Sequence, residues 1–139
     1  DIHQFSAANV SVAIATDDGL FSATIYAADT KSPAEISAAT AELADKAQNG
    51  KLTKEDISGG SFTVSNLGMY GITQFTAIVN PPMGAILALG KATQKVVIGN
   101  GEQRIATVLN ATLSCDHRVI DGAVGAQYLA TLSEVIGSL

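Results

Sequence analysis

The sequence has a single cysteine, no run of basic residues and no long hydrophobic segment, and each of these absences excludes a class of protein. Cys115 has no partner for a disulfide within the chain, which favours a reducing compartment. The 8 basic and 13 acidic residues give a formal charge of -5, and the lysines are scattered, so we expect no nucleic acid partner. The longest apolar stretch, 83–90, is much shorter than the roughly 20 residues that cross a bilayer, so we expect no membrane partner.

The sequence also lacks internal repeats, low-complexity linkers and a recognisable targeting signal. Hydrophobic residues make up 47% of the chain and charged residues 15%, which is typical of a folded globular protein. We therefore predict one domain over residues 1–139, long enough to bury roughly two-thirds of its unfolded surface.

The first half of the chain has clear local signals for a hairpin followed by a helix. Two segments rich in β-branched residues, 9–16 and 20–27, flank Asp17-Asp18-Gly19 and predict two strands joined by a tight turn. The segment 32–35 combines a capping serine, a proline at the first helical position and a glutamate three residues after the cap, so a helix should begin there. Asn49-Gly50 predicts its end.

The second half of the chain is predicted to be mostly β, with a helix at its end. Asp121 occupies a typical N-cap position, and we expect a closing helix from Ala123. The pattern indicates an α/β fold, a two-layer sandwich with a mixed sheet and helices on one face. The other expected elements are a helical turn at 53–57, strands at 61–66, 75–79, 84–89 and 94–98, a turn at Asn100-Gly101 and a long strand at 104–115.

His117 is the first candidate for catalysis. It lies with Asp121 in the link between the long strand and the last helix, where side chains commonly project into a site. An imidazole can accept a proton from a thiol or hydroxyl near neutral pH, which makes histidine the usual general base. The alternative is that His117 is an ordinary loop histidine and that Asp121 merely caps a helix.

Two further residues invite a functional interpretation that their context does not favour. Cys115 precedes His117 by two residues, which suggests a Cys-His nucleophile, but a cysteine on the apolar face of a strand is more often a small core residue. Asp45-Lys46-Ala47 matches the tripeptide around a lipoyl-carrying lysine, yet it falls within an amphipathic helix, so we interpret Lys46 as a solvated surface residue.

Nucleotide and metal sites are not indicated by the sequence. Gly68 and Gly71 follow a strand without a phosphate-loop pattern. The spacing of His3, Cys115 and His117 does not suggest a metal site, and we expect no metal.

Two segments carry a resemblance to a known family. GGSFTVSNLGMYGITQFTAIVNPPMGAILALGKA (59–92) and LSCDHRVIDGAVGAQYL (113–129) closely resemble the catalytic domain of the acyltransferase subunits of 2-oxo acid dehydrogenase complexes. DHRVIDGA is similar to the active-site segment of that family, and SNLGMYG with FTAIVNPP looks most like the pyruvate dehydrogenase branch. Weaker similarity extends the resemblance over nearly the whole chain.

The resemblance implies a chloramphenicol-acetyltransferase-like fold, and a homotrimer with active sites between subunits. His117 would take the proton from the thiol of coenzyme A, and the thiolate would attack the thioester of acetyl-dihydrolipoamide. Ser65 would donate to the oxyanion and Asp121 would orient the active-site loop. Coenzyme A and a lipoyl group on a separate lipoyl domain are the implied substrates, and other pyruvate dehydrogenase complex components are the implied partners. The implied location is the mitochondrial matrix, or the cytoplasm of a bacterium.

Several departures from the family leave alternatives open. Relative to the family domain, the chain is expected to be truncated at both ends, without the first helix and strand and without the C-terminal tail that joins trimers into a cage. Ala23, Thr24 and Gln48 replace the usual family residues outside the active-site segment. Besides an acetyltransferase core or a fragment of one, the chain is compatible with a structural core like protein X, which tethers dihydrolipoamide dehydrogenase.

Overall fold

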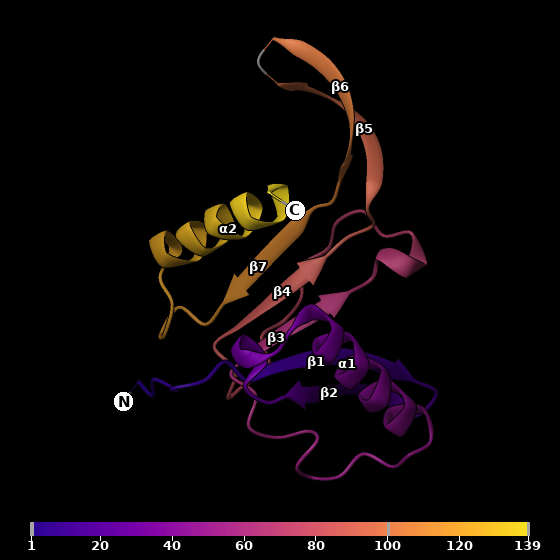
Figure 1. Cartoon of the computed structure of the whole chain (residues 1–139). Coiled ribbons are helices and arrows are strands. Elements are labelled where there is room, and N and C mark those ends of the chain that lie inside the picture. The colour runs from indigo at the N-terminus through magenta and orange to yellow at the C-terminus, as the bar shows by residue number, and fades with distance from the viewer. Residues whose placement is uncertain (1, 100, 139) are drawn as a thin grey trace.

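The computed structural model describes residues 2–99 and 101–138 (Figure 1). Two short 3-10 turns, Ala28–Thr30 and Gly68–Tyr70, accompany seven strands and two helices. In chain order these are β1 (Val10–Thr16), β2 (Gly19–Ile25), α1 (Pro33–Gln48), β3 (Phe62–Asn66), β4 (Ala85–Leu89), β5 (Thr93–Gly99), β6 (Glu102–Val108), β7 (Ala111–Cys115) and α2 (Gly122–Gly137).

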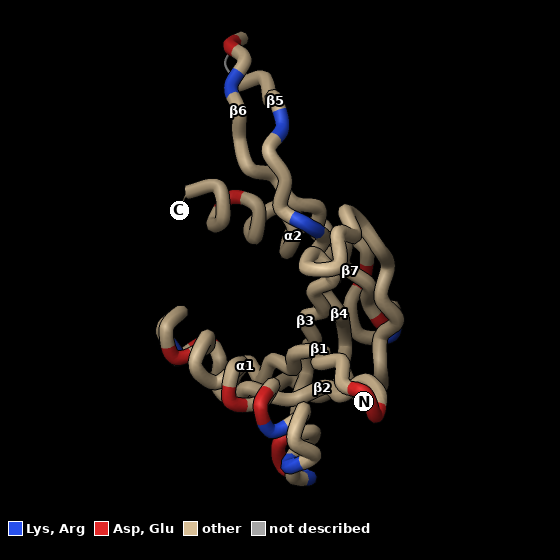
Figure 2. The backbone as a smooth tube through the Cα atoms, turned by 90° about the vertical axis from the view of Figure 1, so that its right-hand side faces the viewer, with Lys and Arg blue, Asp and Glu red and all other residues tan. Residues whose placement is uncertain are grey.

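The main sheet has five strands in the order β2-β1-β3-β4-β7. The three central strands are parallel to one another, and the two outer strands run antiparallel to their neighbours. Both helices lie on the same side of this sheet (Figure 2), with α1 against β1 and β2 and α2 against β7. The predicted two-layer α/β fold with a mixed sheet is therefore confirmed. Strands β5 and β6 pair with each other in a separate two-stranded sheet and project from the main sheet as a ribbon (Figure 1).

Helix α1 begins where the sequence predicts, because Ser32 and Glu35 form a capping box. The Ser32 hydroxyl accepts a hydrogen bond from the Glu35 backbone N–H at 3.3 Å, and the Ser32 N–H donates to the Glu35 carboxylate at 2.8 Å. Pro33 has the first helical position, where no backbone donor is needed. After the C-cap at Asn49, Gly50 has a φ of 64°, which glycine adopts without strain.

Replacing Ser32 with alanine removes this cap, and we expect the free energy of unfolding to fall by about 1 kcal/mol. Urea denaturation of the two proteins measures the difference. Ser37→Ala is the matched control, since Ser37 is exposed within the same helix, and its effect should stay within about 0.5 kcal/mol. Equal losses in the two variants would contradict the capping role.

The hydrophobic core on the α1 side joins this helix to the β1–β2 hairpin. Ile14, Ala23 and Ile25 of the hairpin are buried together with Leu43 and Ala47 of α1. These two helical residues are four apart and so project from the same face of the helix. The predicted amphipathic face of α1 is thus the face that contacts the sheet.

Helix α2 approaches β7 closely because it presents glycine there. A Cβ atom on Gly125 would lie 3.5 Å from the Cys115 sulfur and 3.5 Å from a Leu113 methyl. The same helix places Tyr128 against Phe62 of β3, with the ring centroids 5.6 Å apart. These contacts identify the sheet face that carries Phe62, Leu113 and Cys115 as the face covered by helices.

Two of the strand predictions are wrong. The segment 75–79 is irregular and belongs to neither sheet. The predicted long strand 104–115 is two strands, β6 and β7, which belong to different sheets and are separated at Leu109-Asn110. The Asn110 carbonyl accepts the Gly90 N–H at 2.9 Å, and its side-chain amide donates to the Thr73 carbonyl at 3.1 Å, which holds the chain at this break.

The remaining predictions of local structure have smaller corrections. Residues 54–57 form turns and no helix, with Asp56 accepting the Thr53 backbone N–H at 2.9 Å. Of the predicted Asn100-Gly101 turn, Asn100 lies outside the described residues, and Gly101 has a φ of 82°. Within the described part of the chain, neither helix is long and apolar enough to cross a membrane.

Candidate functional site

His117 lies in the short link between β7 and α2, in a turn that also contains Arg118 and Val119. Its side chain is exposed. Among the described residues, it has no side-chain hydrogen bond or ion pair. The imidazole is therefore presented at the surface of the chain, available to a group outside it.

Asp116 organises this turn through its backbone. Its N–H donates to the carbonyl of Gly84 at 2.9 Å, which attaches the start of the turn to the segment that leads into β4. Its carbonyl accepts the N–H groups of Val119 at 2.9 Å and Ile120 at 3.0 Å. The backbone on both sides of His117 is consequently fixed by one residue.

The side chain of Asp116 closes the same turn with Arg118. The carboxylate accepts the Arg118 backbone N–H at 3.0 Å, and it accepts two guanidinium nitrogens, Nε at 3.0 Å and Nη2 at 2.7 Å. These bonds from Arg118 lower the pKa of Asp116 to about 2. Sequence reasoning missed this pair, although acidic and basic residues on either side of a histidine were a visible signal.

Asp121 is the N-cap of α2, as the sequence predicts. Its carboxylate accepts the Val124 N–H at 2.9 Å as the N-cap of α2. This cap fixes where the link ends and the helix starts, four residues after His117. No hydrogen bond or ion pair joins Asp121 to His117 among the described side chains.

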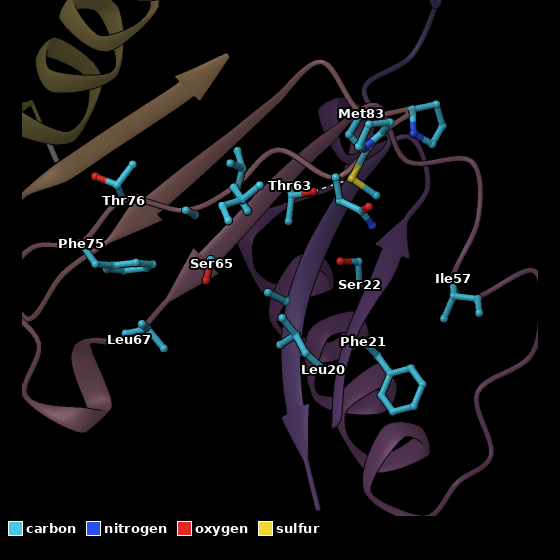
Figure 3. Close-up of a pocket in the computed structure, with 17 residues that line it drawn as sticks. Leu20, Phe21, Ser22, Ile57, Thr63, Ser65, Leu67, Phe75, Thr76 and Met83 are labelled. Carbon is cyan, nitrogen blue, oxygen red and sulfur yellow. Dashed lines mark hydrogen bonds between the residues drawn. The ribbon is translucent and has the colours of Figure 1, made fainter. Parts of the chain in front are cut away.

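Ser65 lies on β3, on the sheet face opposite the helices, because it alternates with Phe62 and Val64. There it lines a cavity of about 740 Å³ (Figure 3). The lining combines a few hydroxyl groups with a largely apolar wall, and it includes the irregular segment 75–78 that the sequence predicted as a strand. Such a cavity, apolar with a few polar groups, is typical of a site for a small molecule.

Ser65 and His117 are not brought together within one chain. Ser65 is level with Ala88 of β4, which is level with Thr112 of β7. From Thr112, β7 runs three more residues to Cys115, about 10 Å along the strand, before the link with His117 begins. The hydroxyl and the imidazole therefore belong to different ends of the sheet, and His117 does not line the Ser65 cavity.

Cys115 is a packing residue, as the context of its strand indicated. It lies under Gly125 of α2 on the helix-covered face. Burial raises the pKa of its thiol, which disfavours the reactive thiolate. A nucleophilic pair of Cys115 with His117 has no support in this geometry.

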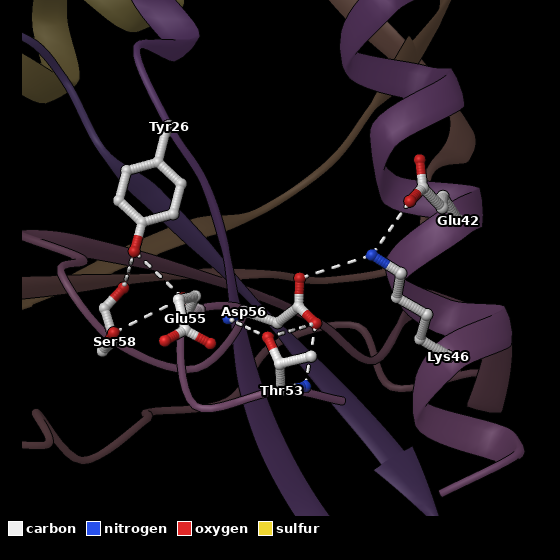
Figure 4. A network of polar contacts seen from close by, with 7 residues as sticks. All are labelled: Tyr26, Glu42, Lys46, Thr53, Glu55, Asp56 and Ser58. Carbon is white, nitrogen blue, oxygen red and sulfur yellow. Dashed lines mark hydrogen bonds and ion pairs between the residues drawn. The ribbon is translucent and has the colours of Figure 1, made fainter. Parts of the chain in front are cut away.

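Lys46 also has a structural role. Its ammonium lies 2.9 Å from a carboxylate oxygen of Glu42 and 3.5 Å from one of Asp56 (Figure 4), and the hydrogen bond with Glu42 raises its pKa. Tyr26 donates to the Glu55 and Ser58 carbonyls at 2.9 Å each, so the same network holds the loop 53–58 against α1 and β2. The likeness of Lys46 to a lipoyl-carrying lysine is confined to the neighbouring residues of the sequence.

Solved structures similar to this chain include acyltransferase cores. The structure described as a probable dihydrolipoamide acetyltransferase of Listeria monocytogenes has a TM-score of 0.94 and 36% identity, covering 99% of this chain and 59% of that one. A dihydrolipoamide acetyltransferase of Azotobacter vinelandii, studied for the role of a serine, a histidine and an asparagine in its catalytic mechanism, has a TM-score of 0.91 and 39% identity over 95% and 54% of the two chains. The cubic core of a pyruvate dehydrogenase multienzyme complex has a TM-score of 0.90 and 38% identity over 94% and 54%. The predicted fold class of acyltransferase cores is thus established.

The family model for the 2-oxoacid dehydrogenases acyltransferase (catalytic domain) matches residues 1–139, and the chain belongs to this family. The dihydrolipoyllysine-residue acetyltransferase component of the pyruvate dehydrogenase complex of Rickettsia bellii is 44% identical over 99% of the chain and 33% of its own length. Component 3 of the mitochondrial enzyme of Arabidopsis thaliana is 49% identical over 92% of the chain and 24% of its own length. The chain thus spans a third or less of these curated relatives.

Proposed function

We propose that this chain is a catalytic domain that transfers an acetyl group between dihydrolipoamide and coenzyme A in a pyruvate dehydrogenase complex. The relatives reported above carry that name, and the resemblance of SNLGMYG and FTAIVNPP to the same branch agrees with them. The lipoyl domain and the other components of the complex are its proposed partners.

One observation carries this proposal, namely the spacing of the site residues. In the Azotobacter protein the studied serine precedes the histidine by 52 residues, and the asparagine follows the histidine by four. In this chain Ser65 precedes His117 by 52 residues, and Asp121 follows it by four. Asp121 stands at the spacing of the asparagine, and either residue can serve as an N-cap.

The proposed reaction uses His117 as the general base. The imidazole removes the proton from the thiol of coenzyme A, and the resulting thiolate attacks the thioester carbonyl of acetyl-dihydrolipoamide. The Ser65 hydroxyl donates a hydrogen bond to the oxyanion of the tetrahedral intermediate, where negative charge develops. When the intermediate collapses, the carbon–sulfur bond to the lipoyl group breaks, and the leaving thiolate takes the proton from the imidazolium of His117.

This chemistry requires two copies of the chain. Ser65 and His117 lie at different ends of the same sheet, so a single copy does not place both groups on one thioester. We propose that His117 of one copy faces the Ser65 cavity of the next, in a homotrimer. The exposure of the imidazole and its lack of a side-chain partner among the described residues support this arrangement.

The observations favour an enzyme over a structural core like protein X. Ser65 and His117 are both present, at the spacing of residues studied for catalysis in a solved acetyltransferase. For its location we propose the mitochondrial matrix or a bacterial cytoplasm, since the relatives include mitochondrial and bacterial proteins.

An assay of acetyl transfer from acetyl-coenzyme A to dihydrolipoamide tests this function, together with sedimentation of the same sample. We expect turnover by a species with three times the monomer mass. A trimer without transferase activity would overturn the enzymatic proposal and favour the structural alternative. An active monomer would overturn the shared site.

A further inference from the structure

We propose that Asp116 and Arg118 are a positioning pair for His117: their ion pair closes the turn that carries it, with opposite charges on the residues immediately before and after the histidine. The inference rests on the proposed role of His117 as the general base. It concerns the side-chain contacts of the two residues that flank the histidine in the turn.

The exposure of Arg118 limits what the ion pair contributes to stability. The Arg118 side chain is 82% exposed, while that of Asp116 is 19% exposed. Ion pairs at the protein surface contribute little to the free energy of folding, because water screens them. The backbone bonds of Asp116 to Gly84, Val119 and Ile120 already define the turn without the guanidinium.

What the guanidinium adds is geometric restraint and charge balance beside His117. The fork of Arg118 binds both carboxylate oxygens of Asp116, and the Arg118 N–H binds the same carboxylate, so the residues before and after His117 are held to each other. Without Arg118, an uncompensated carboxylate would stand next to the imidazole and favour its protonated form. Without Asp116, an uncompensated guanidinium would favour the neutral form.

Among the residues that the structure describes, few other charges line the surroundings of this turn. The hollow next to it is lined, besides the pair itself, by residues without charge: Ile2, Pro81, Pro82, Met83 and Val119. The turn is attached to the backbone of Gly84, and α2 contributes Asp121, whose carboxylate is occupied by the Val124 N–H. His3, a further titratable group, is next to Ile2 in the sequence. Removing the charge of Asp116 or Arg118 should therefore change the protonation equilibrium of His117 more than removing any other charge near this turn.

The chain allows a direct test, because His3 and His117 are its two histidines. Proton NMR follows the C2–H resonance of each ring against pH, and a His3→Gln variant assigns them. We expect Arg118→Gln to move the titration midpoint of His117 upward, and Asp116→Asn to move it downward, each by about half a pH unit. The double variant should return to within about 0.2 of the starting midpoint, since both charges are then absent.

The same four proteins are compared in the acetyl transfer assay. We expect the acidic limb of the pH profile of kcat/KM to move in the direction of the NMR midpoint in each variant. Arg118→Lys separates the two parts of the proposal, because lysine keeps the charge but not the fork. It should leave the midpoint in place and lower kcat, with the KM for coenzyme A unchanged.

Midpoints that stay in place in both single variants would overturn the proposal, and so would midpoints that move in the same direction. An Arg118→Lys protein with full kcat would overturn the positioning part. Failure of the proposed function is distinguishable, because it would appear as absence of acetyl transfer in the parent protein, whatever the NMR midpoints do.

Discussion

Replacing His117 with alanine should lower acetyl transfer by about 10²- to 10⁴-fold, the usual contribution of a positioned general base. Without the imidazole, the thiol of coenzyme A has to lose its proton to water before it can attack. The measurement is kcat/KM for transfer from acetyl-coenzyme A to dihydrolipoamide, with the oligomeric state checked by sedimentation.

His3→Ala is the control for the loss of a histidine, because His3 lies in the N-terminal segment before β1 and has no proposed role. Its activity should match that of the parent protein. If His117→Ala kept full activity with an unchanged oligomer, the general-base assignment would be wrong.

Replacing Ser65 with alanine should lower kcat by about 10²- to 10³-fold, as the loss of a single oxyanion donor does in enzymes that have an oxyanion hole. The hydroxyl is proposed to bind the oxyanion more strongly than the ground-state carbonyl, so the effect should fall on kcat with little change in KM. Steady-state kinetics with both substrates varied separates these two parameters.

Ser114→Ala is the matched control for Ser65→Ala. Ser114 is a partly buried serine on β7, and its register with Ile86 and Thr63 places it on the same helix-free face. It has no proposed contact with the reacting atoms, so its kcat should stay within about twofold of the parent value. An equal loss in both variants would point to disturbed packing of the sheet instead of oxyanion stabilisation.

The local structure was predictable wherever one short segment contained all the information. The capping box at Ser32 and Glu35, the hairpin around residues 17–19 and the N-cap at Asp121 depend on residues a few positions apart, and all three are present. In each of them, a polar side chain or a tight turn satisfies backbone groups of its own segment. Such signals are independent of how the sheet is assembled.

The wrong strand predictions concern segments whose structure depends on pairing with strands far away in the sequence. Residues 75–79 have strand composition, but they belong to neither sheet. The alternation over 104–115 continues through Leu109-Asn110, although the chain leaves the ribbon for the main sheet there. Alternation reports which side a residue faces, and it does not report to which sheet the strand belongs.

The candidate site was predictable in its residues more than in its geometry. The link that carries His117 and the cap at Asp121 lie where the sequence places them. The separation of Ser65 from His117 follows from the parallel register of β3 with β4 and the antiparallel register of β4 with β7, which no local pattern reveals. The pairing of Asp116 with Arg118 needed the turn geometry that brings alternate residues together.

The placement of Ser65 and His117 at different ends of one sheet has a further consequence: two inactive variants should complement each other. In the proposed trimer, each catalytic centre would combine the imidazole of one polypeptide with the hydroxyl of the next. If His117→Ala and Ser65→Ala chains are unfolded, mixed in equal amounts and refolded together, about one centre in four combines two intact groups. The mixture should then regain roughly a quarter of the parental turnover from two inactive parents, whereas centres made by single chains would regain none.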